Sequence, residues 1–328
     1  MEKTMKRLMK TGPKTTTLVD VPVPTLPNED WVLVKLKYCG VCMSEHYDWS
    51  ADIPARSFGH EPIGVVVEVG KNVTALKVGD RVSGGGFGGG AEYAVAHPSG
   101  IVKIPDHVSD TAAVIEPLAC LLSAVGKLRP MMNGEKVAVV GCGYMGCGAI
   151  SLLAMKGYYV VAVDIRPECL ENAKKYGAKE VYLPEELPEE YLSDKNPRVN
   201  GFPVVMEWGE TNESLDLAIH MTRMCGQLAV AAYHTGEKRL VNLERLGAYA
   251  IDLLNTHPRE VDINNRANQL AMQLLADGSW SYLCVPTKVY PITKFDQAQG
   301  ELTEKYGKWM KAVVNWDVDA DFEPYIVE

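Results

Sequence analysis

No stretch of this sequence reaches 18 consecutive apolar residues, so every apolar run is shorter than a membrane-spanning helix requires. Residues 1–20 carry basic side chains but no apolar core and no small-residue cleavage site, so we expect no secretory signal. Lysine and arginine form no block longer than a few residues, and the formal net charge is −9, from 33 basic and 42 acidic residues. The sequence therefore predicts neither a nucleic-acid partner nor a membrane partner.

The cysteines do not form the compact framework that braces small secreted domains. Eight of them are spread along the chain: Cys39, Cys42, Cys120, Cys142, Cys147, Cys169, Cys225 and Cys284. We therefore expect a reduced protein in the cytoplasm.

The length of 328 residues exceeds what one ordinary hydrophobic core covers, so two domains are expected. Up to about residue 116 the sequence consists of short β-rich segments separated by Gly, Pro, Asn and Asp. These segments are WVLVKLKYCG, PIGVVVEVG, DRVSG and AEYAVAHP. The N-terminal part is predicted to be mostly β.

From about residue 117 the pattern changes to alternating helices and buried strands, beginning with the helix-like PLACLLSAVGKL. Strand candidates lie at residues 135–141, 159–164, 180–183, 202–208, 226–233 and 250–255. Apolar runs separated by helical patterns are typical of a parallel sheet covered on both faces. A helix is predicted in INNRANQLAMQLLADGS, after which the tail returns to strand-like pieces and is expected to fold back onto the N-terminal half.

A glycine triplet follows the first of these strand candidates. Gly141, Gly143 and Gly146 form the pattern G-x-G-x-x-G at the start of a predicted helix, and Asp164 ends the next strand at about the expected spacing. The first glycine permits the turn, the second lets a pyrophosphate approach the backbone, and the third lets helix and strand come close. The helix N-terminus then faces the phosphates. Strand, triplet, helix and acid together predict a dinucleotide site.

Asp164 also bears on which dinucleotide binds. Its carboxylate can accept hydrogen bonds from the adenosine ribose and repels a 2′-phosphate, so NAD is favoured over NADP. Arg166 opposes this preference, because an arginine can pair with a phosphate. Tyr144, Met145 and Ile165 complete the predicted cofactor-binding set.

A second group of residues has side chains that suit a transition metal. Cys42 precedes the adjacent pair His60 and Glu61, and Glu116 is a carboxylate in an otherwise apolar segment. Zinc accepts thiolate, imidazole and carboxylate together, whereas calcium and magnesium prefer oxygen alone. Each residue by itself has an ordinary structural explanation, but together they predict a metal site. Cys39 leaves an alternative open, because it forms C-x-x-C with Cys42, which could be a redox pair or supply two ligands.

The sequence resembles the medium-chain dehydrogenases, specifically the zinc-dependent alcohol and polyol dehydrogenases. The resemblance covers nearly the whole chain and rests on CGVCMSE, GHEPIGVVVEVG, VGDRV, AEYAV, IEPLAC and VAVVGCGYMG, in the family's order and approximate spacing. It implies that Cys42, His60 and Glu61 belong to a catalytic zinc site and that Ser44 takes the substrate proton. Glu116 matches a glutamate of the sorbitol, threonine and glucose branches that ligates zinc directly or through water.

The predicted fold class is α/β, with a Rossmann doubly wound parallel sheet and a mostly β, GroES-like catalytic domain. We expect the catalytic domain over residues 1–118, completed by about 279–328, and the NAD-binding domain over 119–278.

Three departures from the family pattern affect the prediction. Many members carry a lobe of four cysteines for a structural zinc, but here that interval is only SGGGFGGG, so we expect one catalytic zinc per chain and no structural zinc. The histidine that usually follows the Ser/Thr-Asp pair is shifted, since Ser44 is followed by Glu45 and His46, which leaves the outer proton relay open. The segments YHTGEKRLVN and LLNTHPREVDINNRANQLA fit no particular branch, which leaves the substrate open.

The resemblance implies an NAD-dependent zinc oxidoreductase that transfers a hydride between NAD and a secondary alcohol, polyol or sugar-like substrate. Zinc would lower the pKa of the substrate hydroxyl, Ser44 would pass the proton outward, and Glu61 and Glu116 would tune the metal. A homodimer or homotetramer is expected. Two alternatives stay open: a zinc-free quinone or enone reductase of the same superfamily, and a dinucleotide-binding protein without turnover.

Overall fold

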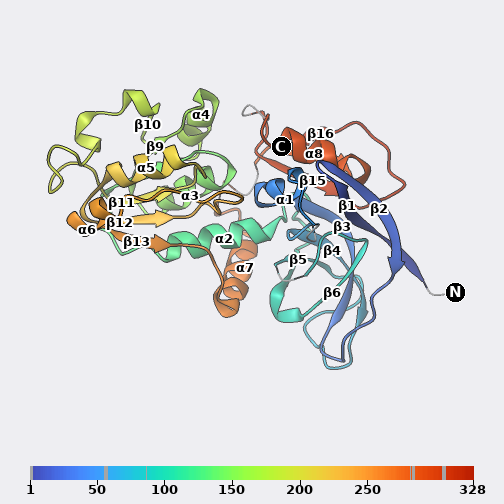
Figure 1. The fold of residues 1–328 in the computed structure, drawn as a ribbon. Coiled ribbons are helices and arrows are strands. Elements are labelled where there is room, and N and C mark those ends of the chain that lie inside the picture. Colours follow the sequence, from blue (N-terminus) through green and yellow to red (C-terminus); the bar gives the residue numbers. More distant parts are fainter. Residues whose placement is uncertain (1–2, 55–57, 86, 281, 283–284, 305–307) are drawn as a thin grey trace. The chain divides into compact units, whose positions relative to one another are not determined.

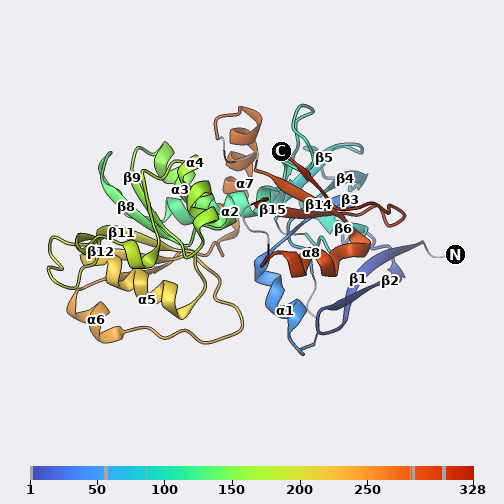
Figure 2. The same cartoon turned by 90° about the horizontal axis from the view of Figure 1, so that it is seen from above.

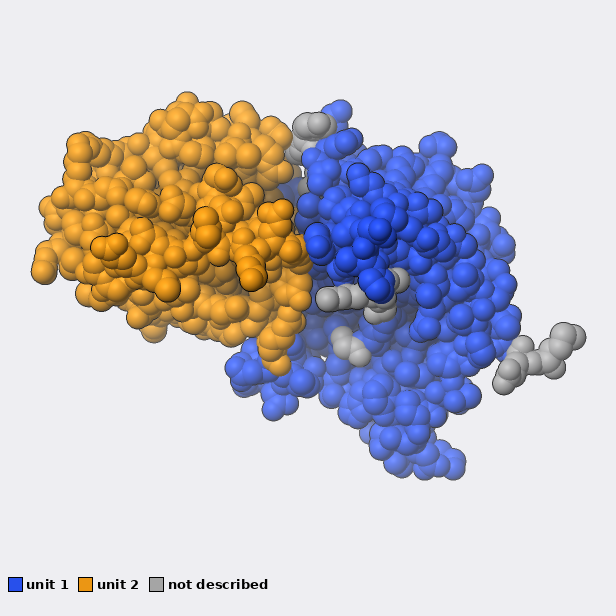
Figure 3. Space-filling model, in the orientation of Figure 1, with its two compact units in different colours: residues 1–119, 260–328 blue, residues 120–259 orange. Residues whose placement is uncertain are grey.

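Each of the two structural units contains one large sheet. The computed structural model describes residues 3–54, 58–85, 87–280, 282, 285–304 and 308–328. Unit 1 contains residues 1–119 and 260–328, and unit 2 contains residues 120–259 (Figure 3).

Unit 1 is the mostly β part. Its strands are β1 (Thr4–Gly12), β2 (Thr15–Pro22), β3 (Val32–Val41), β4 (Pro62–Val69), β5 (Arg81–Gly84), β6 (Tyr93–Ala96), β7 (Ile101–Lys103), β14 (Thr287–Pro291), β15 (Lys311–Asn315) and β16 (Tyr325–Val327). Eight of them form a sheet in the order β16-β14-β15-β3-β4-β5-β7, with β6 also paired to β3, while β1 and β2 form a separate hairpin. Its helical segments are α1 (His46–Ser50), α7 (Val261–Ala276), α8 (Phe295–Glu301), the 3-10 turns η1 (Met43–Glu45), η2 (Pro98–Gly100) and η6 (Ile292–Lys294), and the beginning of α2 (Ile115–Gly126).

Strand β3 shows why this sheet forms. Val34 and Leu36 are buried while Lys35 and Lys37 are exposed, which is the two-residue alternation of a strand with one buried face. At its end β3 pairs antiparallel with β15, with Ala312 opposite Val41. The blue N-terminal and red C-terminal strands of Figure 1 therefore lie side by side. This pairing brings the start of β15 next to the residues that follow β3.

Unit 2 is a doubly wound parallel sheet. Its strands are β8 (Lys136–Val140), β9 (Tyr159–Val163), β10 (Glu180–Tyr182), β11 (Phe202–Glu207), β12 (Thr222–Val230) and β13 (Asp252–Asn255), and its helical segments are α3 (Tyr144–Met155), α4 (Pro167–Lys175), α5 (Asn212–Met221), α6 (Leu243–Ala248), η3 (Pro184–Glu186) and η4 (Glu189–Tyr191). The order β10-β9-β8-β11-β12-β13 is that of the Rossmann fold. In Figure 2, α3 and α4 lie on one face of this sheet and α5 and α6 on the other. The predicted fold class and all six predicted strands are confirmed.

Two features differ from the sequence-based expectations. The β1–β2 hairpin was not predicted, and helix α7 belongs to unit 1, although its residues were assigned to the NAD-binding domain. The physical reason for the second difference is that α7 packs on β7 and η2, and its last residue, Ala276, accepts a hydrogen bond from His107 Nε2 at 3.0 Å. Among the described residues, no helix is both long enough and apolar enough to cross a bilayer.

Strand β10 begins with a carboxylate that holds three tyrosines together. Glu180 accepts hydrogen bonds from the hydroxyls of Tyr159, Tyr182 and Tyr191 at 2.8, 2.7 and 2.6 Å. Lys136 Nζ lies 3.4 Å from the same carboxylate. Partial burial by itself raises the pKa of Glu180, but the three hydroxyls and the Lys136 charge outweigh it and lower the pKa from 4.5 to about 2.

A pH-dependent contribution to stability follows from this lowered pKa. Because the folded-state pKa lies below the unfolded value, the contribution is complete above pH 4.5 and is lost as the pH falls toward 2. We expect Glu180→Gln to destabilise unit 2 at pH 7 by about 1.5–3 kcal/mol, the range for hydrogen bonds to a charged group. Urea unfolding at several pH values checks this, with the exposed Glu185→Gln as control. A difference from wild type that stayed constant from pH 7 to pH 3 would contradict the assignment.

Candidate active site

Cys42 lies where β3 ends and η1 begins. Its backbone is extended, with φ −113° and ψ 140°, and Ser44 Oγ donates a hydrogen bond to its Sγ at 3.2 Å. Cys39 lies on β3 within the hydrophobic core of unit 1 and donates its thiol to the Gly40 carbonyl at 3.4 Å. Burial raises the pKa of the Cys39 thiol far above its usual range. Both cysteines are free thiols in different surroundings, and only Cys42 lies beside the predicted metal ligands.

Glu45 orients the ring of His60. His60 lies two residues before the start of β4. Glu45 Oε1 accepts hydrogen bonds from His60 Nδ1 and from the backbone N–H of Gly59, both at 2.7 Å. Because Nδ1 donates to a carboxylate, Nε2 carries the lone pair that a metal requires. Gly59 has φ +81°, and a Cβ there would lie 2.5 Å from the Gly89 carbonyl carbon, so glycine is needed before this histidine.

The surroundings of His60 also favour positive charge. Burial by itself lowers the pKa of His60, but hydrogen bonds to Cys42 and Glu45, and the charges of both groups, outweigh it and raise the pKa. A divalent cation at this position would meet the same negative groups.

Glu61 is buried against the start of β15. Its side chain is 0% exposed, and Lys311 Nζ lies 2.7 Å from Oε1 and 2.5 Å from Oε2. Lys311 Nζ also donates to the Val41 carbonyl at 3.2 Å. A Cβ on Gly40 would overlap the Glu61 carboxylate, so this glycine makes the space that the carboxylate occupies.

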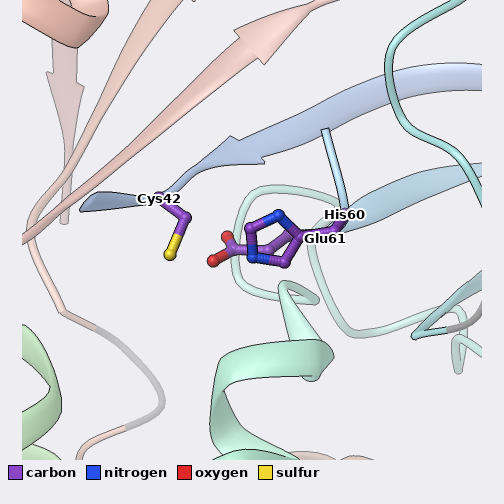
Figure 4. A group of neighbouring side chains, drawn as sticks. All are labelled: Cys42, His60 and Glu61. Atoms are coloured by element: carbon purple, nitrogen blue, oxygen red, sulfur yellow. The ribbon is translucent and has the colours of Figure 1, made fainter. Parts of the chain in front are cut away.

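Cys42, His60 and Glu61 each bring one ligand atom to a common region, as Figure 4 shows. The sulfur, a ring nitrogen and a carboxylate oxygen lie within 4.8 Å of one another. Ligand atoms of one tetrahedral zinc are about 3.5 Å apart, as bond lengths of about 2.0–2.3 Å require, so small side-chain movements would close the group around an ion. This donor set suits zinc and does not suit calcium or magnesium. The residues present therefore fit a zinc ion.

Glu116, the other predicted ligand, lies outside this group of three. It is in the first turn of α2 and partly buried, with its Cγ 3.3 Å from the point that a Cβ on Gly85 would occupy. Its ligation of zinc, directly or through water, stays a prediction.

The glycine triplet has the geometry of a dinucleotide-binding turn. Gly141 has φ +92°, and a Cβ there would lie 2.7 Å from the backbone nitrogen of Gly209, which follows β11. A Cβ on Gly146 would overlap the Gly141 carbonyl. The first and third glycines are thus required by the turn and by the close approach of α3, as the sequence predicted.

The second glycine leaves open space. Apart from the adjacent backbone, a Cβ on Gly143 would have, among the described residues, one atom within 4 Å, Arg166 Nη2 at 3.9 Å, so a phosphate group could approach the backbone here. Gly143 caps α3, whose first residues are Tyr144 and Met145, both partly buried. The predicted cofactor-binding residues of the turn therefore surround the N-terminus of a helix.

Asp164, directly after β9, is in contact with this turn. Its Oδ2 accepts a hydrogen bond from the backbone N–H of Cys142 at 2.7 Å. Arg166 donates to the same carboxylate through its backbone N–H, Nε and Nη2, at 2.9, 3.1 and 3.2 Å. Ile165 between them is 77% exposed. Asp164 therefore lies where the motif predicted an acid, but its carboxylate forms an ion pair with Arg166.

Three residues of these sites were not identified from the sequence. Glu45 is the last residue of CGVCMSE, next to Ser44, and a carboxylate at this position was the one indication in the sequence of its role. Lys311 had no local signal, because it lies 250 residues from its partner Glu61. Glu207, fully buried at the end of β11, accepts hydrogen bonds from Gly209 N and Ser214 Oγ, both at 2.7 Å, and so shapes the segment against which the glycine turn lies.

Removal of Lys311 tests the buried ion pair. Lys311→Met would leave the Glu61 carboxylate buried without a counter-charge, which typically costs about 3–5 kcal/mol. We expect this loss in urea unfolding of chelator-treated protein, and no comparable loss for the exposed Lys308→Met. A Glu61→Gln/Lys311→Met double variant should recover most of the stability, because no charge is then left buried. Equal stability of Lys311→Met and wild type would show that the pair contributes nothing.

Comparison with known proteins is consistent with this geometry. Residues 28–106 match the family model of the alcohol dehydrogenase GroES-like domain, and residues 145–276 match that of zinc-binding dehydrogenases. The chain is 28% identical to a probable D-xylulose reductase A of Arthroderma otae, over 92% of this chain and 95% of the relative. It is 30% identical to an L-threonine 3-dehydrogenase of Chelativorans, over 70% of this chain and 77% of the relative.

The fold has a similar counterpart among solved structures. L-idonate 5-dehydrogenase from Escherichia coli superposes with a TM-score of 0.81 at 20% identity, over 96% of this chain and 99% of the other. With two family models matched in order and a relative at 30% identity, the chain belongs to the medium-chain zinc-containing dehydrogenases, a family that acts on alcohols and polyols with NAD(H) or NADP.

Proposed function

We propose that this protein is a zinc-dependent dehydrogenase that oxidises a secondary alcohol of a polyol, sugar-like compound or hydroxy compound of similar size, with NAD as a hydride acceptor. The observation that supports it most strongly is the convergence of Cys42, His60 and Glu61 within 4.8 Å, with the Ser44 hydroxyl at the sulfur. A structural role alone would not require a thiol, an imidazole and a carboxylate to meet.

The proposed metal site divides its tasks among neighbouring residues. Cys42 and His60 would hold the zinc, and Glu61 and Glu116 would ligate it directly or through water. When bound, zinc supplies Lewis acidity that lowers the pKa of a substrate hydroxyl toward neutrality. Glu45 keeps His60 Nε2 as the acceptor nitrogen by holding Nδ1–H at 2.7 Å. Glu61, whose charge Lys311 already balances, would contribute less negative charge than a free carboxylate.

Ser44 is the proposed proton carrier. Its hydroxyl is partly buried and now donates to the Cys42 sulfur at 3.2 Å, so it lies within reach of a group bound next to that sulfur. A hydroxyl can accept the substrate proton while it donates its own outward. Bound NAD would supply the hydride acceptor through its nicotinamide ring, and the 141–146 turn would hold the dinucleotide through its pyrophosphate.

The relatives support the proposed substrate class. A D-xylulose reductase and an L-threonine 3-dehydrogenase act, by their names, on compounds with secondary hydroxyls or the corresponding ketones. We propose a polyol or a related hydroxy compound, since identity near 28% does not carry one substrate from a relative to this chain. The homo-oligomeric state and the cytoplasmic location stay predictions.

Elemental analysis and a substrate panel test the proposal together. We expect one zinc per chain, because the interval 83–90 contains no cysteine for a structural site. Among polyols, sugars and hydroxy acids we expect at least one that reduces NAD in a zinc-dependent reaction. Two zinc ions per chain would overturn the single-site proposal. Enone reduction by metal-free protein would identify the zinc-free reductase, and tight dinucleotide binding without turnover would identify a binding protein.

A further inference from the structure

The hydrogen-bonding capacity of Asp164 is already used within the protein. Its side chain is 4% exposed. Oδ1 accepts from Arg166 N and Nε, and Oδ2 accepts from Cys142 N and Arg166 Nη2, all between 2.7 and 3.2 Å. Each carboxylate oxygen has two lone pairs, so these four bonds occupy all the acceptor positions. A ribose hydroxyl can donate to Asp164 only by displacing one of them.

Arg166 has the opposite character, with donors to spare. Its side chain is 44% exposed, and its Nε–H and one Nη2–H point to Asp164. The other three of its five N–H groups make no hydrogen bond within the part of the chain that the structure describes. Nη2 lies 3.9 Å from the point that a Cβ on Gly143 would occupy, so the guanidinium is beside the second glycine of the turn.

The charges at this position are also balanced. The carboxylate of Asp164 would repel a 2′-phosphate if it were unpaired, and this repulsion is the usual reason for NAD preference. Here the guanidinium forms a two-pronged ion pair with it, which cancels most of its field at the adenosine end. Arg166 also directly precedes helix α4, whose N-terminus carries partial positive charge.

We propose that Arg166 makes this protein a dual-specificity enzyme, which binds NADP through the 2′-phosphate as well as NAD. The inference deepens the cofactor assignment of the proposed function and rests on its dinucleotide site, but not on its zinc chemistry. With NADP, the three uncommitted N–H groups of Arg166 would bind phosphate oxygens while Nε and Nη2 keep their hold on Asp164. With NAD, the same groups would donate to the ribose hydroxyl oxygens.

Binding of cofactor fragments tests this without any hydride transfer. Adenosine 2′,5′-bisphosphate and 5′-AMP differ only in the 2′-phosphate, and NADPH and NADH extend the comparison to whole cofactors. By calorimetry or fluorescence titration of the zinc-loaded protein, we expect dissociation constants for NADPH and NADH within about tenfold of each other. Arg166→Ala should weaken binding of NADPH and the bisphosphate by about 10–100-fold, the value of a charge-assisted hydrogen bond. Binding of NADH and 5′-AMP should change by less than about threefold, because the Asp164 carboxylate, released from the guanidinium, can then accept hydrogen bonds from the ribose hydroxyls.

Two further variants make the result specific. Asp164→Ala should strengthen binding of NADPH relative to NADH, because the remaining repulsion between the carboxylate and the 2′-phosphate disappears. Arg198→Ala removes the same charge from the exposed segment before β11 and should change neither affinity. Melting temperature and zinc content, measured on each preparation, show whether the variant is folded.

The outcomes separate the two proposals. NADPH binding more than about 100-fold weaker than NADH in wild type, or equal losses of both cofactors in Arg166→Ala, would overturn dual specificity and leave an NAD-dependent dehydrogenase. Failure of both cofactors to bind folded wild-type protein would overturn the dinucleotide site, and with it both proposals.

Discussion

His60→Ala is expected to lose zinc and activity together. The substitution removes a neutral nitrogen donor that neither water nor a nearby carboxylate replaces at equal strength, and it leaves Glu45 Oε1 with one hydrogen bond, from Gly59. Since Lewis acid assistance supplies several kcal/mol, turnover should fall by about a thousandfold or more. Elemental analysis and the rate of nicotinamide reduction, measured on one preparation, check this.

The same variant separates a catalytic from a structural histidine. The glycine turn and Asp164 belong to unit 2, whereas His60 belongs to unit 1, so NADH affinity and the main thermal transition should survive. His97→Ala, which removes an exposed imidazole from unit 1, is the matched control and should keep zinc and turnover. Full zinc occupancy with near-normal turnover in His60→Ala would end the metal assignment. A lower melting temperature, with activity that follows the folded fraction, would make His60 a structural residue.

The parallel sheet was predictable because its signals are local. Each strand of unit 2 is an apolar run between helical patterns, and the handedness rule for crossovers fixes much of the strand order once the glycine turn marks the first strand. The β1–β2 hairpin has a weaker signal, since Gly12 and Pro13 mark a turn but the flanking strands are not apolar runs. The residue with positive φ in its turn is Lys14, at φ +56°, whereas glycine or asparagine at this position would have predicted a hairpin turn.

Helix α7 shows a second limit of sequence reasoning. Its amphipathic pattern predicts a helix, and Val261–Ala276 is one. The pattern says that one face is buried but not on which surface, and the partners β7 and η2 lie about 160 residues earlier in the chain. Assignment of such a helix to a unit therefore depends on contacts that no local pattern contains.

For the site, the sequence identified the types of the functional residues, but it did not show which of their side chains are in contact. The thiol, imidazole and carboxylates could be identified because zinc accepts few other side chains. Cys42, and not Cys39, lies beside His60 because Cys39 is within β3 and in the hydrophobic core, whereas Cys42 follows the end of the strand. Asp164 and Arg166 were both visible as opposing signals, but their ion pair depends on side-chain conformation.

Ser44→Ala is expected to separate proton transfer from metal binding. The variant loses the hydroxyl that donates to Cys42 Sγ at 3.2 Å but keeps the predicted zinc ligands, so zinc content should be unchanged. Turnover should fall by about 10²–10⁴-fold, the usual effect of removing a positioned proton carrier. Ser44→Thr keeps a hydroxyl at the same position and should restore most of the rate. Ser50→Ala, which removes a hydroxyl that donates to the Tyr47 carbonyl at 3.4 Å, should resemble wild type.

The pattern of rates decides what Ser44 does. A purely structural hydroxyl would lower stability in Ser44→Ala without a selective loss of turnover, so melting temperature and kcat are compared on the same samples. Normal turnover in Ser44→Ala would remove it from the proton path. The next candidate would then be His46, whose Nδ1 lies 3.2 Å from the Gln299 carbonyl oxygen. Since that contact occupies one ring nitrogen, His46 could relay a proton only through Nε2, and His46→Gln should then show the loss that Ser44→Ala did not.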